Sequence, residues 1–251
     1  MKKREWKILL SVGFVGSLLP SFLFATAQTR LESSVTGVLN ALTPIFTILI
    51  GLFIYRQHQP GRVFVGIIVG FIGTAILIMA GSERAWSINF YAFFVVLATL
   101  FYGTNLNLIK YHLADQRALT ITSISLAMVG PIALIYLLGA TDYTYKIVHV
   151  DGAILSSSYI ILLGVLGTAI ALILFNKLVQ ITDPVFTSSV TYIIPVVAVI
   201  WGLADGEKLY FMHYFGMAGI ILGVYLANKS KRLKLKNGLK KKVTDKADQK
   251  A

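Results

Sequence analysis

The residues best suited to bind a small molecule are neutral polar side chains inside long apolar stretches of the chain. Asn40 and Thr43 are three positions apart, as are Tyr102 and Asn105, so each pair lies on one face of a helix. Amides and hydroxyls at membrane depth line a cavity or bond a neighbouring helix, because lipid offers them no partner. We predict a polar solute cavity with these candidates: Asn40, Thr43, Pro44, Tyr102, Asn105, Thr187, Thr191, Tyr192 and Pro195.

The threonines and prolines among these candidates have a second interpretation. Thr36 and Thr47 continue the face of Thr43, and threonine commonly forms hydrogen bonds between membrane helices. A proline in mid-span removes a backbone hydrogen bond, which either exposes a carbonyl to a ligand or fixes a kink. The sequence leaves both alternatives open.

Groups that support enzyme chemistry are missing from these stretches. The chain has no cysteine, and its four histidines fall near the ends of the apolar stretches without a second metal ligand at helical spacing. Carboxylates are absent from the centres of the stretches, where a charged group is costly and usually functional. We therefore predict no catalytic residue, no metal, no cofactor and no enzymatic activity.

The elements that must position the polar residues are membrane helices. Hydrophobic residues make up 56% of the chain and charged residues 14%, against roughly 25% charged in an average soluble protein. A helix needs about 20 mostly apolar residues to cross the hydrocarbon core. We predict eight spans, at residues 7–27, 34–54, 63–81, 89–109, 120–138, 154–175, 184–203 and 212–228.

The net charge of +12 is concentrated at the C-terminus. Residues 229–251 hold ten Lys or Arg and two Asp. No basic stripe interleaved with aromatic residues accompanies them, so nucleic acid is not an expected partner. We predict a basic cytoplasmic tail that contacts membrane lipid.

Lysine and arginine also predict the orientation. If Met1 is cytoplasmic, 19 of the 23 Lys and Arg fall on the cytoplasmic side, which is where membrane proteins concentrate them. We therefore predict a multi-pass protein of the cytoplasmic membrane with both termini in the cytoplasm.

An internal repeat relates the two parts of the chain. A shift of 151 residues aligns Gly13 with Gly164, Thr36 with Thr187, and Pro44 with Pro195, and these matches run in order through consecutive spans. Duplicated halves of this kind are common in transporters. Small residues that permit close helix packing recur in both copies: Gly66, Gly70, Gly73, Gly216, Gly219 and Gly223.

The sequence resembles the drug/metabolite transporter superfamily, and within it the EamA-type permeases. The resemblance rests on residues 23–27 and 41–47 in the first copy and on residues 192–196 and Gly206-Glu207 in the second. It implies an all-α integral membrane protein, an inverted-repeat bundle with three helices of one repeat (residues 1–81) and five of the other (residues 89–228). The usual form has five and five, so the first two helices are expected to be missing. The family's acidic residue is present as Glu207, whereas Arg56 holds the aligned position of the first copy.

The function implied by the resemblance is transport. We expect a permease that moves a small metabolite or amino-acid-like solute by alternating access. The alternative is a truncated membrane protein that does not transport, or a subunit that completes a partner permease. A chain with three plus five helices is expected to associate with another copy, or to need two N-terminal helices, before the polar face around Asn40 is covered.

Overall fold

The computed structural model describes residues 3–79, 89–182, 187, 193–207 and 209–227. Every element within these ranges is a helix, which confirms the predicted all-α bundle. The first half contains α1 (Lys3–Gly13), η1 (Phe14–Leu18), α2 (Leu19–Gln28), α3 (Ser33–Asn40), α4 (Thr43–Phe53) and α5 (Arg62–Met79). The second half contains α6 (Tyr91–His112), α7 (Ala118–Ala140), α8 (Tyr143–His149), α9 (Ala153–Leu163), η2 (Gly164–Ile170), α10 (Ala171–Ile181), α12 (Ile193–Ala204) and a helix at Phe211–Ala227.

Among the described residues, five helical stretches are long and apolar enough to cross a membrane. They are Arg4–Gln28, Ser33–Phe53, Tyr91–His112, Ala118–Ala140 and Ala153–Ile181. Three shorter apolar helices, Val63–Met79, Ile194–Ala204 and Phe211–Ala227, coincide with the remaining predicted spans.

The structure differs from the predicted spans in the fifth and sixth helices. The sixth helix continues to Ile181 rather than ending at residue 175, and the short helix α8 precedes it. Hydropathy gave no sign of either, because α8 is only seven residues long and the last turns of α10 carry polar residues such as Asn176 and Gln180. The predicted tail at 229–251 lies outside the described residues.

The second span is broken at Pro44. Because proline has no N–H, the carbonyl of Asn40 has no donor one turn later. The hydroxyl of Thr43 donates to that carbonyl instead, at 2.8 Å, and α3 ends at Asn40 while α4 starts at Thr43. The break places Asn40 at an irregular point in mid-span.

Two π-helical segments interrupt the first and sixth spans at equivalent positions of the repeat. The shift of 151 places η1 on residues 165–169, which lie within η2. In the first copy, Pro20 follows directly and cannot donate to the carbonyl of Gly16. Short π segments of this kind are frequent at functional sites.

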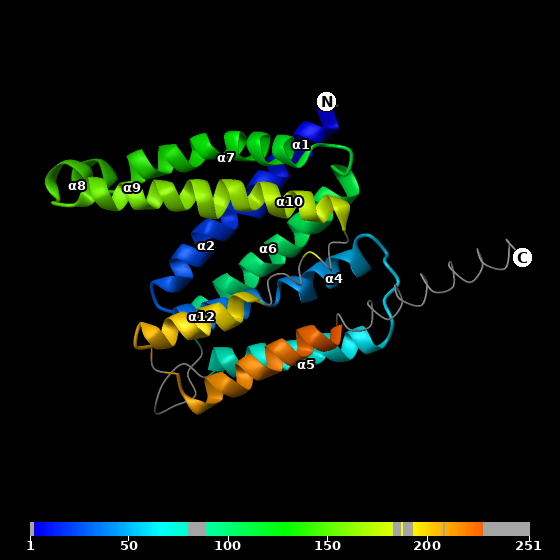
Figure 1. The fold of residues 1–251 in the computed structure, drawn as a ribbon. Coiled ribbons are helices and arrows are strands. Elements are labelled where there is room, and N and C mark those ends of the chain that lie inside the picture. The colour runs from blue at the N-terminus through cyan, green and yellow to red at the C-terminus, as the bar shows by residue number, and fades with distance from the viewer. Residues whose placement is uncertain (1–2, 80–88, 183–186, 188–192, 208, 228–251) are drawn as a thin grey trace, which may run out of the picture.

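Helix α6 connects two hydrophobic cores. Its first turns contribute Ala92 and Val95 to a core built on α3, α4, α5 and the helix Phe211–Ala227. Its last turns contribute Leu106 and Ile109 to a second core with α1, α7 and α10. Figure 1 shows α6 running diagonally between these two parts of the bundle. The middle of α6 therefore lies between the cores.

The six glycines predicted to pack helices face one another between α5 and the helix Phe211–Ala227, which lie side by side at the bottom of Figure 1. A Cβ atom on Gly223 would lie 2.3 Å from the backbone nitrogen of Gly70. A Cβ on Gly66 would lie 2.3 Å from the nitrogen of Ala227. Only glycine permits these two backbones to approach so closely.

The outer parts of α7 and α9 form an arm that projects from the bundle, joined by α8 at the left of Figure 1. No residue between 130 and 175 is buried. The surface of the arm is rich in large apolar side chains, among them Ile135, Ile160 and Leu163. The arm therefore offers an extended apolar surface to its surroundings.

Candidate solute cavity

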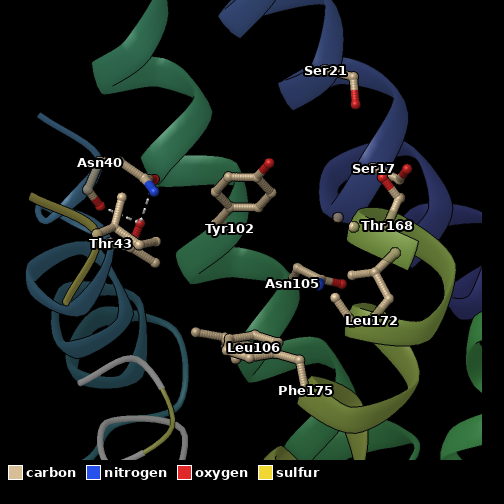
Figure 2. Close-up of a pocket in the computed structure, with 14 residues that line it drawn as sticks. Ser17, Ser21, Asn40, Thr43, Tyr102, Asn105, Leu106, Thr168, Leu172 and Phe175 are labelled. Atoms are coloured by element: carbon tan, nitrogen blue, oxygen red, sulfur yellow. Dashed lines mark hydrogen bonds between the residues drawn. The ribbon is translucent and has the colours of Figure 1, made fainter. Parts of the chain in front are cut away.

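A cavity of about 320 Å³ lies beside the middle of α6, between the two cores. Four walls surround it: the break between α3 and α4, helix α6, the segment η1–α2, and the segment η2–α10 (Figure 2). Its described polar lining residues are Ser17, Ser21, Asn40, Thr43, Tyr102, Asn105 and Thr168. Both copies of the repeat contribute to it.

The first wall is held by the break at Pro44. The hydroxyl of Thr43 donates to the backbone oxygen of Asn40 at 2.8 Å and lies 3.4 Å from its amide oxygen (Figure 2). The side-chain amide of Asn40 therefore keeps both its nitrogen as a donor and its oxygen as an acceptor for the cavity.

The second wall is α6, which presents Tyr102 and Asn105. The ring of Tyr102 stacks on Phe24 with ring centroids 5.9 Å apart. Asn105 is 5% exposed, and its buried amide oxygen has no hydrogen-bond partner in the described part of the chain. It lies against Gly16, where a Cβ atom would be 2.6 Å from the amide nitrogen. A buried acceptor without a donor costs free energy, so this oxygen is suited to meet a ligand.

The remaining polar groups come from the π-helical segments and are not among the residues predicted from the sequence. Ser17 in η1 and Thr168 in η2 both line the cavity, lie near each other in Figure 2, and are equivalent under the shift of 151. Ser21 follows one turn after Ser17. The repeat alignment contained the signal, because it pairs two hydroxyl residues at 17 and 168.

Five of the nine predicted cavity residues are not among its described lining. Pro44 and Pro195 are buried in helix packing, and the buried hydroxyl of Thr187 lies 2.8 Å from that of Thr182. Thr191 and Tyr192 lie outside the described residues. The structure thus brings together Asn40, Thr43, Tyr102 and Asn105.

A second cavity, of about 470 Å³, adjoins the first. The two share Asn40 and Ile194, and the second extends between α2, α3 and α12 to Gln28 and Ser33. The space beside α6 therefore continues towards the end of the bundle where α2 connects to α3.

At that end, Glu207 joins α12 to the start of α3. Its carboxylate accepts hydrogen bonds from the backbone nitrogens of Ser33 at 2.7 Å and Ser34 at 3.1 Å, and from the Ser34 hydroxyl at 2.5 Å. Burial alone would raise the pKa of Glu207, but these hydrogen bonds lower it. The free N–H groups of a helix start are a favourable site for a carboxylate. Burial and the neighbouring Glu207 raise the pKa of Glu32.

The structural counterpart of Glu207 is Gln57, which corrects the alignment with Arg56. The backbone nitrogen of Gln57 donates to Gly51, and that of Glu207 donates to the equivalent Gly202, both at 2.9 Å. The preceding residues, Arg56 and Gly206, both have positive φ, 50° and 82°. The loop of the first copy is one residue longer, and the sequence does not show where the extra residue lies.

The opposite end of the bundle is closed by polar contacts. The Lys110 ammonium donates to the backbone oxygens of Gln180 and Thr182, and the Gln180 amide donates to those of Leu113 and Gln116. Tyr55 stacks on Tyr111 with ring centroids 4.1 Å apart. The hydrogen bonds join helices of the second copy, and the Tyr55–Tyr111 stacking joins the second copy to the first.

The described residues contain no cluster of three His, Cys, Asp or Glu that could hold a metal ion. The chemistry available in the cavity is hydrogen bonding, aromatic stacking and apolar contact.

Comparison with known proteins agrees with this architecture. The sequence profile of the EamA-like transporter family matches residues 1–79 and 89–229. The uncharacterized transporter YetK of Bacillus subtilis is 21% identical over 234 residues, which cover 90% of this chain and 69% of YetK. The uncharacterized transporter YojE of the same organism is 35% identical over 81 residues, or 32% of this chain and 26% of YojE. A crystal structure that is 15% identical shares the fold, with a TM-score of 0.61 over 93% of this chain and 79% of its own.

Proposed function

Since this chain belongs to the EamA-like transporter family of multi-pass membrane proteins, we propose that it moves a small metabolite or amino-acid-like solute across the cytoplasmic membrane by alternating access. Both termini lie in the cytoplasm, and the chain has no enzymatic activity of its own. The solute binds in the cavity beside α6.

The observation that carries the proposal is the composition of that cavity. Ser17 and Thr168 occupy equivalent positions of the two repeats and line the same space. A site built from two related halves changes its access when one half rocks against the other, which is how many repeat transporters work. Asn40, Tyr102 and Asn105 then hold the solute at mid-depth.

The two ends of the bundle support alternating access. The cavity adjoins the larger space that extends towards Ser33, whereas the end at Lys110 and Gln180 is held by hydrogen bonds. The positive-inside orientation assigns the Lys110 end to the cytoplasm. This arrangement corresponds to a state with its larger opening towards the outside.

A second candidate is a subunit that completes a partner permease. It is favoured by the arm of residues 130–163, which has no buried residue. It is also favoured by α12, where Ile200 and Trp201 are exposed beside the second cavity. In that case the partner supplies the helices that cover these faces, and the cavity residues keep their roles.

An efflux experiment with a mixture of candidate solutes tests the proposed function. Membrane vesicles with and without the full chain are loaded with a small-molecule extract of the host cell, and the released compounds are compared by mass spectrometry. We expect at least one compound to leave faster through the wild-type chain. The variant Asn105→Leu should abolish that difference at equal abundance in the membrane. If no compound distinguishes the two kinds of vesicle, the proposal is wrong.

A further inference from the structure

We infer that the cavity beside α6 selects an uncharged solute with a hydrogen-bond donor at one end and an apolar group at the other. This inference rests on the proposed function and narrows its solute class to neutral amides, alcohols and similar compounds. Carboxylates and ammonium ions of the same size are disfavoured.

The first argument is the character of the lining. Each of the fourteen described lining residues is uncharged, and the polar ones offer only amides, hydroxyls and a phenol. A charge moved from water into such a site loses its hydration and finds no opposite charge among these residues. A neutral polar group loses less hydration, and amides and hydroxyls can replace its hydrogen bonds.

The second argument is the unsatisfied oxygen of Asn105. It is a buried acceptor that lacks a donor in the described part of the chain, so a ligand N–H or O–H group would supply the missing partner. A carboxylate has no hydrogen to donate and would leave this oxygen without a partner. Asn105 therefore favours a solute that carries a donor group.

The third argument is the separation of polar and apolar walls. Figure 2 shows Leu106 and Phe175 together at one end of the cavity, with Leu172 beside them. The hydroxyls of Ser17 and Thr168 and the amide of Asn40 lie on the walls away from this end. An aromatic or branched apolar group fits against Leu106 and Phe175. The volume of about 320 Å³ is at the small end for a ligand pocket, which favours a compact solute.

Three probes of nearly equal size test the charge selectivity directly. They are 2-phenylacetamide, 2-phenylacetate and the 2-phenylethylammonium ion, which share a ring and differ in charge. Binding of each labelled probe to the purified full chain is measured by equilibrium dialysis at pH 7. Specific binding is the part lost in Thr168→Trp, which fills the cavity. Ser158→Trp, on the exposed arm, is the matched control and should retain full binding.

We expect the amide to bind at least tenfold more tightly than either ion. A negative charge in the cavity should reverse part of this preference. In Asn105→Asp the ammonium ion should gain at least tenfold in affinity over wild type. Asn40→Asp, on a less buried wall, should show the same direction if Asn105→Asp does not fold. Asn89→Asp lies outside the cavity and should leave the order unchanged.

The inference is overturned if either ion binds as tightly as the amide, or if none of the three probes shows specific binding. It is also overturned if neither aspartate variant increases binding of the ammonium ion. These outcomes differ from a failure of the proposed function. A chain that prefers phenylacetate and still releases a compound in the efflux assay remains a transporter, whereas a chain that releases nothing is not one, whatever it binds.

Discussion

Asn40 contributes to the molecule in two ways. Its backbone oxygen accepts the Thr43 hydroxyl at the helix break, and its side chain lines both cavities. Only the side chain faces solute, so the fold and the site can be separated by mutation.

The variant Asn40→Leu should lower the rate of solute efflux at least tenfold without reducing the amount of protein in the membrane. Leucine keeps the volume but removes the amide, and the backbone contact to Thr43 survives. Efflux from vesicles and immunodetection of the chain measure the two effects. Ser158→Leu, on the exposed arm, is the control. Normal efflux through Asn40→Leu would show that Asn40 only packs against its neighbours and does not bind the solute.

Glu207 provides a prediction about pH. Because hydrogen bonds from Ser33 and Ser34 lower its pKa from the ordinary value of 4.5, the folded state favours the ionised carboxylate. Its contribution is therefore complete above pH 4.5 and is lost as the pH falls through the lowered pKa. Glu207→Gln should destabilise the chain by about 1 kcal/mol at pH 7, after allowance for solvent screening.

Thermal unfolding in detergent at pH 7 and near pH 3 measures this effect. The difference between wild type and Glu207→Gln should be present at the higher pH and smaller at the lower one. Asp205→Asn, two residues away, should show little difference at either pH. An equal loss at both pH values would show that Glu207 does not act through its charge.

Helix α5 and the helix Phe211–Ala227 can pack closely because glycines, which have no side chain, occupy their contact. Gly223→Ala places a methyl group 2.3 Å from the nitrogen of Gly70, so the helices must separate. We expect a loss of about 1–3 kcal/mol, which thermal unfolding would detect. Gly139→Ala is the matched control, because nothing lies within 4 Å of its Cβ position. If both variants unfold at the wild-type temperature, the two helices are not in close contact.

Several elements could be predicted from the sequence because hydropathy and covalent geometry determine them. The long spans follow from apolar length, and the break after Asn40 follows from the missing N–H of Pro44. The sequence shows that the loop of the first copy is one residue longer, because Gly66 pairs with Gly216 at a shift of 150. It does not show where the extra residue lies, so it could not distinguish Gln57 from Arg56 as the counterpart of Glu207. Ser17 and Thr168 were missed because a hydroxyl within a helix usually bonds its own backbone. Only the structure, in which four helical segments surround the cavity beside α6, shows that Ser17 and Thr168 line the same cavity.

The described helices around the two cores are well packed, whereas the arm formed by α8 and the outer parts of α7 and α9 has no buried residue. Helix α6 contacts both cores. The hydroxyl of Ser158 already donates to the backbone oxygen of Ile154, at 2.9 Å, so the uncovered surface of the arm is mainly apolar. Lipid or a second copy of the chain would cover it.

We therefore expect the purified chain to associate with another copy through this arm. Because the natural sequence has no cysteine, Leu162→Cys introduces a single thiol on the arm. Oxidation or a short bifunctional reagent should yield a covalent dimer in native membranes. Phe64→Cys, exposed on α5, should yield much less. A strictly monomeric mass in mild detergent, without a cross-linked product, would contradict association.

In the proposed alternating-access mechanism, the cavity beside α6, which is built from both repeats, is reached from both sides of the membrane. The most direct test of this access is labelling of Thr168→Cys by a membrane-impermeant maleimide in right-side-out and inside-out vesicles. The wild-type chain has no cysteine and gives the blank, and the buried Thr74→Cys is the negative control. We expect labelling of Thr168→Cys in both kinds of vesicle, while Thr74→Cys stays unlabelled in both. Labelling from one side only, or from neither, would contradict it.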